Sequence, residues 1–301
     1  MPVRMPASTA IAALWLALPT PALAQAPIES RQAMGRASPE AWAMRTLAAT
    51  TLMTPFGEPL PAGRWMVAAD LGHIPRLDES QRQVGLGGVK AEDLNKSPVF
   101  GRIRGAVALP GGIVAEAGWT PPLEIDGAKP RHLFAFALGG RVVEREGLSL
   151  AVRALAQVGD VRGDITCPAS IAGIDDPVAN PFRCRERSRD TFKTDHAGID
   201  ATLSGGSGRW RWHASAGVVR TDLAVQVDAL AGNVRERAYL SSKSSMGWLA
   251  GGLRHRLGDG WSVAAEVLHV PLGVTRPPST SKDRDAMTSV RLQLRYDAGN
   301  D

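Results

Sequence analysis

The sequence contains 301 residues, of which 22% are charged and 5% aromatic, and its formal net charge is +5. This length accommodates one large domain with a short extension, and the chain has no internal repeat of fixed period, which argues against a solenoid. It contains no Gly-rich phosphate loop, zinc-protease helix motif, calcium loop or Gly-x-Ser-x-Gly elbow. The motifs therefore give no direct evidence of a nucleotide-dependent or metal-dependent enzyme.

The first 24 residues have the pattern of a secretory signal peptide. Arg4 precedes an apolar run over residues 10–18, and Ala22-Leu23-Ala24 forms a small-residue cleavage site. The run is too short to cross a bilayer as a helix, and no later stretch is long and apolar enough to do so. We therefore expect residues 1–24 to be removed and the mature protein to be exported. If it enters a membrane, it must do so as a β-barrel.

Residues 25–62 are expected to form an extension that contains a short helix. Ser38 followed by Pro39 is typical of a helix N-terminus, with serine as the cap and proline in the first turn. The helix is expected to continue to Met53 and to present apolar side chains such as Trp42 and Leu47.

From residue 63 onward, segments that alternate apolar and polar residues are joined by connections that are in turn long and short. The short connections, rich in the residues that tight hairpins require, lie at 110–112, 145–147, 205–208 and 258–260. The long connections lie at 77–97, 124–130, 162–191, 222–241 and 274–286. Counting segments between these breaks predicts about ten strands. In the penultimate long connection alternation continues, which predicts a protruding hairpin that turns near Gly232 and Asn233.

The alternation separates an apolar face from a polar face in each predicted strand. In the last strand, for example, Leu292 and Leu294 lie opposite Arg291 and Gln293. The basic residues assigned to the polar face are Arg64, Arg102, Arg104, Arg141, Arg153, Arg211, Arg254, Arg291 and Arg295. The acidic residues assigned to it are Asp70, Glu116, Asp200 and Glu266.

Aromatic residues on the apolar face gather near the two ends of the predicted strands. Those near the ends with short connections are Trp65, Trp210, Trp212, Trp261 and Tyr296, and those near the opposite ends are Trp119, Phe134 and Phe136. Two such belts are expected where amphipathic rings sit at the two interfaces of a membrane.

With these features, the region from Arg64 to Tyr296 resembles the superfamily of bacterial outer-membrane β-barrel proteins. The resemblance is architectural. It implies an all-β, antiparallel up-and-down transmembrane barrel of about ten strands over residues 63–298, in the outer membrane of a Gram-negative cell envelope, with both chain ends in the periplasm. Residues 25–62 would then be periplasmic. The implied partners are outer-membrane lipid, including lipopolysaccharide, and the barrel assembly machinery during biogenesis, and nucleic acid is not expected. The alternative is a soluble periplasmic β-barrel that binds a small ligand.

Two interpretations of the extension remain open: a plug or lid for the barrel mouth, or a helix lying at the periplasmic interface, which we favour. Cys167 and Cys184, the two cysteines of the chain, fall in the longest connection and are expected to form a disulfide in an exported protein. A metal site is not expected from two thiols alone. The positive net charge of the chain suits acidic partners such as lipopolysaccharide phosphates. A genome that favours arginine over lysine explains this charge equally well.

The polar face supports two hypotheses about function. Its charges either form buried ion pairs that fill a narrow lumen, which we favour, or line a narrow, porin-like pore that prefers anions. We expect no catalytic residue and no cofactor. The competing hypothesis is a hydrolase or lipid-modifying enzyme with a site at the extracellular rim, formed from His73, His132, His196, His269 and Asp195. The sequence does not specify an oligomeric state.

Overall fold

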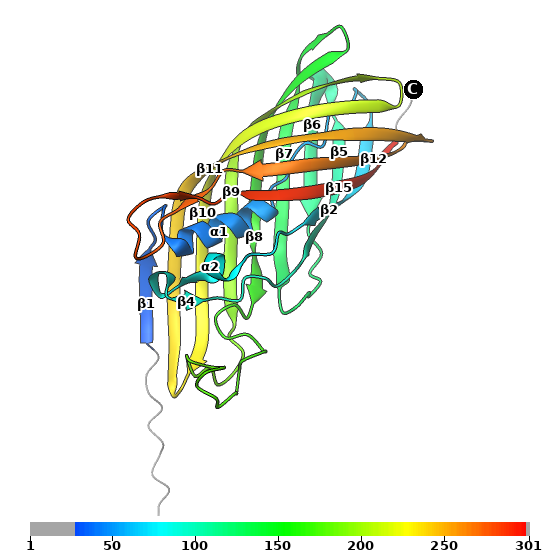
Figure 1. Ribbon diagram of the computed structural model, residues 1–301. Helices are drawn as coiled ribbons and strands as arrows, with labels where there is room; N and C mark the ends of the chain where they lie inside the picture. The colour runs from blue at the N-terminus through cyan, green and yellow to red at the C-terminus, as the bar shows by residue number, and fades with distance from the viewer. Residues whose placement is uncertain (1–27, 299–301) are drawn as a thin grey trace, which may run out of the picture.

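The computed structural model describes residues 28–298, and these form a closed barrel of ten antiparallel strands (Figure 1). The barrel strands are β2 (Trp65–His73), β5 (Val99–Ala108), β6 (Ile113–Trp119), β7 (Lys129–Arg145), β8 (Leu148–Gly163), β9 (Asp190–Ser207), β10 (Trp210–Ala231), β11 (Val234–Gly258), β12 (Trp261–Val270) and β15 (Met287–Ala298). Each strand pairs with its neighbour in this order, and β15 pairs with β2 to close the ring. The predicted fold class is confirmed. The predicted signal peptide lies outside the described residues.

The barrel wall places apolar side chains outside and polar side chains inside. In β12, Trp261, Val263 and Val267 are exposed, whereas Ser262 and Glu266 are buried. A protein that folds in water does the reverse, because its large apolar side chains are the ones removed from solvent. An apolar outer band with a polar interior is the arrangement of a barrel that is surrounded by lipid.

The two ends of the barrel differ. At one end, here called the turn end, short connections join β5 to β6, β7 to β8, β9 to β10 and β11 to β12; the first of these includes the 3-10 turn η2 (Pro110–Gly112). At the other, here called the loop end, β10 and β11 continue as a paired hairpin to Ala231↔Val234. This confirms the predicted protrusion, which points downward in Figure 1. In outer-membrane barrels the short turns lie on the periplasmic side.

The long connections carry small elements of their own. Between β2 and β5 lie α2 (Glu79–Arg82), β3 (Gln83–Gly85), the 3-10 turn η1 (Leu86–Gly88) and β4 (Lys90–Ala91). Between β12 and β15 lie β13 (Gly273–Val274) and β14 (Asp283–Arg284), which pair with each other. In the connection from β8 to β9, Cys167 and Cys184 form the predicted disulfide, with Cα atoms 5.6 Å apart.

The N-terminal part of the chain runs through the barrel. β1 (Ile28–Ala33) pairs in parallel with residues 236–241 of β11 at the loop end. Helix α1 (Pro39–Thr50), capped by Ser38, follows; its start and cap agree with the sequence pattern, and it ends three residues before the expected Met53. The next residues reach the turn end, where β2 begins. We call residues 34–62 the plug segment. None of the helices formed by residues 28–298 is long and apolar enough to span a membrane.

This path corrects one expectation. We expected the extension on the same side as the C-terminal end of the barrel, either as a plug or lid for the barrel mouth or, as we favoured, as a helix on the interface. Instead, Ile28 lies at the loop end and Ala298 at the turn end, and α1 lies inside the wall (Figure 1). The physical reason is that α1 is buried around most of its circumference, with Trp42 and Met44 at 1% and 2% exposure. Such burial requires an enclosing wall, which an interface does not supply.

Candidate functional site: the plugged lumen

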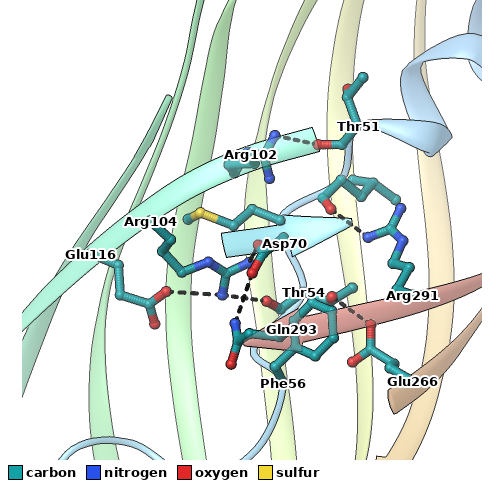
Figure 2. A network of polar contacts seen from close by, with 12 residues as sticks. Thr51, Thr54, Phe56, Asp70, Arg102, Arg104, Glu116, Glu266, Arg291 and Gln293 are labelled. Carbon is teal, nitrogen blue, oxygen red and sulfur yellow. Dashed lines mark hydrogen bonds and ion pairs between the residues drawn. The ribbon is translucent and has the colours of Figure 1, made fainter. Parts of the chain in front are cut away.

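Arginines of the barrel wall hold the plug segment through its main-chain carbonyl oxygens. Arg291 donates to Leu52 O at 2.6 Å, to Ala49 O at 3.0 Å and to Thr50 O at 3.1 Å. Four other wall arginines each donate to one plug carbonyl: Arg102 to Thr51 O at 2.7 Å, Arg153 to Met53 O at 3.0 Å, Arg104 to Thr54 O at 2.8 Å and Arg254 to Phe56 O at 2.6 Å. Figure 2 shows part of this ladder.

The position of the ladder follows from the end of α1. The last carbonyls of a helix have no partner within the helix and carry partial negative charge, so cations beside them are stabilising. The guanidinium groups of Arg291 and Arg102 meet this need at Ala49, Thr50 and Thr51. Beyond the helix, the carbonyl oxygens of the irregular backbone at Leu52, Met53, Thr54 and Phe56 need hydrogen-bond donors, because these residues are buried.

Acidic side chains of the wall neutralise the same arginines. Arg104 contacts Asp70 at 2.8 Å and Glu116 at 3.3 Å. Arg153 contacts Glu116 at 3.0 Å and Asp200 at 2.8 Å. Glu116 therefore links the two arginines into one network, which Figure 2 shows around Arg104. Buried charges are tolerated when each has partners, and removal of one partner leaves the others uncompensated.

Glu266 of β12, the cross-strand neighbour of Arg291, also binds the plug. Its Oε1 accepts from Thr54 Oγ1 at 2.6 Å, and its Oε2 lies 3.0 Å from His213 Nε2. The side chains of His213 and Glu266 are fully buried. A catalytic relay needs the histidine between the hydroxyl and the acid. Here the carboxylate lies between the other two groups, so the arrangement holds the plug and does not activate Thr54 as a nucleophile.

The predicted lumen residues are distributed as follows. Six of the nine basic residues are 1–7% exposed and line the lumen: Arg102, Arg104, Arg153, Arg254, Arg291 and Arg295. The other three lie toward the turn end. Arg211 pairs with Glu58 of the plug at 2.5 Å, Arg141 pairs with Glu144 away from the network, and Arg64 precedes β2 and is partly exposed. The four predicted acidic residues, Asp70, Glu116, Asp200 and Glu266, all belong to the buried network.

Several members of the network were not singled out from the sequence. Gln157 accepts from Arg102 at 2.8 Å and donates to Thr51 Oγ1 at 2.7 Å and Thr194 Oγ1 at 2.9 Å. Gln293 donates to Asp70 at 2.9 Å and accepts from Arg254 at 3.2 Å. Both glutamines stand at inward positions of the alternating pattern. The plug residues carry no such signal, because nothing in residues 51–58 indicates what surrounds them.

The structure does not assemble the hypothetical rim site. His196 is buried in the lumen, with Nδ1 3.3 Å from Thr194 O, whereas the neighbouring Asp195 accepts from Gly159 N on the other face of the strand. The remaining three histidines, His73, His132 and His269, are exposed on separate strands. Since adjacent residues of a strand point to opposite faces, His196 and Asp195 cannot act together.

The predicted aromatic belts lie on the outer face. At the turn end, Trp65, Trp210, Trp212 and Trp261 are exposed, and the Tyr296 ring lies 6.3 Å from Trp65 and 5.1 Å from Trp261. Toward the loop end, Trp119, Phe134 and Phe136 are exposed, and Trp119 pairs in register with Phe134. With a closed antiparallel wall, an apolar outside and a polar inside, these features define an integral outer-membrane β-barrel protein.

No protein-family model and no curated protein sequence matches the chain. Similar solved structures include the toluene transporter TbuX of Ralstonia pickettii, with 10% identity, TM-score 0.33 and coverage of 80% of this chain and 90% of that chain. The outer membrane protease OmpT of Escherichia coli has 9% identity and a TM-score of 0.35, and the match covers 78% of this chain and 94% of that chain. The attachment invasion locus protein Ail of Yersinia pestis has 10% identity and a TM-score of 0.31, and the match covers 79% of this chain and 100% of that chain. Similarity of this size carries no information about the activity of this chain.

Proposed function

We propose that the protein is a non-enzymatic binding and structural barrel of the outer membrane that is closed by its own N-terminal segment. The observation that carries this proposal is the ladder of wall arginines on plug carbonyls between Ala49 and Phe56. An anion-preferring pore needs arginines that face water. Here the donors of the buried arginines are directed to carbonyls and carboxylates, which fits a filled lumen better than a conducting one.

The competing functions receive less support. A narrow channel would require the plug segment to leave the lumen, which breaks charge-assisted hydrogen bonds along its whole length. A rim enzyme would need the histidines and Asp195 to converge, and their side chains do not. Under the proposal, the partners of the outer face are the surrounding lipid, lipopolysaccharide included, and the machinery that inserts the barrel.

Planar-bilayer conductance tests the closed state. Folded wild-type protein is expected to give no steady current at any voltage at which the bilayer is stable. The double variant Arg102→Ala with Arg291→Ala removes four hydrogen bonds to the helix end and the residues after it, so we expect intermittent current from it. Arg141→Ala is the matched control, because Arg141 contacts Glu144 and not the plug. A steady wild-type current would contradict the proposal.

A further inference from the structure

The barrel wall is incomplete on one side near the loop end. β6 ends at Trp119, where it pairs with Ile103 of β5 and with Phe134 of β7. β5 begins four residues before Ile103, and β7 begins five residues before Phe134, so residues 99–102 and 129–133 have no barrel strand between them. Only Thr120 continues the pairing, donating from its backbone N to Leu133 O at 3.0 Å. Residues 121–128 cross this interval as an irregular loop.

A cavity of about 440 Å³ occupies this interval. Its lining comes from both faces of the wall. Leu71 and Ile103, which are 48% and 52% exposed on the lipid-facing side, line it together with the inward-facing Leu133 and Phe192. Leu47 of the plug segment completes its inner end. The cavity therefore joins the outer apolar face of the barrel to the side of the plug, and it does not depend on the closed route along the barrel axis.

We propose that this cavity is a binding site for a hydrocarbon chain that enters sideways from the bilayer. The inference rests on the proposed function, since a closed lumen makes lateral entry the available route. The volume lies within the range of about 300–1,000 Å³ that is usual for small-ligand sites. The lining is mostly apolar and continuous with the lipid-facing surface, so contact with hydrocarbon is favourable. Its charged members are Asp70, Lys96, Arg102 and Arg162. Asp70 is bound by Arg104, Lys96 by Asp93 and Asp164, and Arg102 by Thr51 O and Gln157.

One polar lining residue has no side-chain partner of its own in the described part of the chain. Thr120 is 4% exposed, and its Oγ1 has no hydrogen-bond partner among the described residues. A buried hydroxyl costs free energy until it is paired, so it offers one hydrogen bond to a polar group at the end of an otherwise apolar occupant. Two sources share the required chemistry: an acyl chain of a membrane lipid and a single-chain amphiphile taken from the surroundings.

Two glycines of β5 provide a matched pair of variants. Both Gly101 and Gly105 lie on the outer face. A Cβ atom added at Gly101 would lie 3.9 Å from its nearest neighbour, Asp70 O, and one added at Gly105 would lie 3.8 Å from Met66 O. Gly101 lines the cavity. Gly105, four residues further along the strand, does not. Gly101→Phe therefore fills the entrance, and Gly105→Phe adds the same side chain to the same face of the same strand outside it.

The experiment is a fluorescence titration of each protein in amphipol with 1-aminoanthracene, an uncharged apolar probe. We expect saturable binding at one site in the wild type, affinity weakened about tenfold or more by Gly101→Phe, and affinity unchanged by Gly105→Phe. Heat-modifiable migration verifies that each variant is folded. Displacement by decanol but not by a short-chain phospholipid identifies a free single chain as the occupant, and displacement by the phospholipid identifies a lipid acyl chain.

Absence of saturable binding, or equal affinity in the two phenylalanine variants, would overturn the inference. These results are distinguishable from failure of the proposed function, because conductance reports on the lumen alone. A barrel that carries no current and binds no probe refutes only the lateral site, whereas a barrel that conducts refutes the closed lumen.

Discussion

At the scale of residues, single arginines connect the wall, its acids and the plug. Arg153 is the clearest case, because one guanidinium contacts Asp200 through two hydrogen bonds of 3.1 Å and 2.8 Å, Glu116 at 3.0 Å and Met53 O at 3.0 Å. Bidentate geometry of this kind suits arginine and not lysine. The polar face was predictable from the alternation of strands, but the carbonyl acceptors were not.

Arg153→Met is expected to destabilise the barrel strongly. The substitution leaves Glu116 and Asp200 without a main partner in a dry interior, which costs about 3–5 kcal/mol when one member of a buried ion pair is removed. Urea unfolding in lipid vesicles measures the change. The control Arg141→Met disrupts a pair that is 30% and 59% exposed, and about 1 kcal/mol or less is expected there. Similar losses from both variants would contradict the account.

A second residue-scale prediction concerns pH. Glu92 lies in the connection after β4, and burial raises its pKa to about 7 although Lys90 Nζ lies 2.9 Å away; Asp190 and Glu236 add to the rise. Because the folded pKa exceeds the ordinary value of 4.5, the stabilisation is present below pH 4.5 and is lost as pH rises through about 7. The hydrogen-exchange protection factor of the Asp93 amide, which donates to Ile165 O, should therefore fall between pH 5 and 7 once the base-catalysed intrinsic rate is divided out. Glu92→Gln should abolish the trend; a trend that persists in this variant would refute it.

At the scale of elements, sequence pattern predicts the wall far better than it predicts the plug. The alternation in β12 and β15 has one interpretation, because a period of two places every second residue outside. α1 was predictable as a helix from Ser38 and Pro39. Its position was not, since a helix with Trp42 and Leu47 suits an interface as well as a lumen. Its burial on nearly all sides and the arginine donors at its C-terminal end distinguish these positions, and both are visible only in three dimensions.

The disulfide is expected to stabilise its own connection and not the barrel. Cys167 and Cys184 are separated by 17 residues in the sequence, and closing a loop of that size contributes roughly 3 kcal/mol in the chain-entropy model. Cys167→Ser with Cys184→Ser should make residues 164–189 sensitive to protease at the loop end. Heat-modifiable migration should remain as in the wild type. Loss of that migration would show that the bond supports the barrel itself.

At the scale of the whole molecule, the path of the plug segment through the lumen places the two ends of the described chain at opposite ends of the barrel. β1 lies beside β11 at the loop end, and β15 ends among the short turns. If short turns face the periplasm, as in outer-membrane barrels generally, then β1 faces the cell surface. This topology follows from a path through the lumen that no local sequence signal specifies, whereas an even strand count alone predicts both chain ends on the same side.

Surface labelling of intact cells tests this topology. Glu29, whose side chain is 71% exposed in β1, is replaced by Cys, and Asp259 in the turn between β11 and β12 provides the matched position at the other end. A membrane-impermeant maleimide is expected to label Glu29→Cys in intact cells and Asp259→Cys only after the outer membrane is permeabilised. The reverse result would place the loop end in the periplasm.

The most direct test of the central claim, that the N-terminal segment fills the lumen, is a cysteine cross-link between plug and wall. Thr51 Oγ1 and Thr194 Oγ1 lie 3.4 Å apart across 143 residues of sequence. With Thr51→Cys and Thr194→Cys together, oxidation of native membranes followed by proteolysis and mass spectrometry should yield one peptide pair joined at residues 51 and 194. Recovery of the two peptides unlinked from folded, membrane-inserted protein would contradict the account.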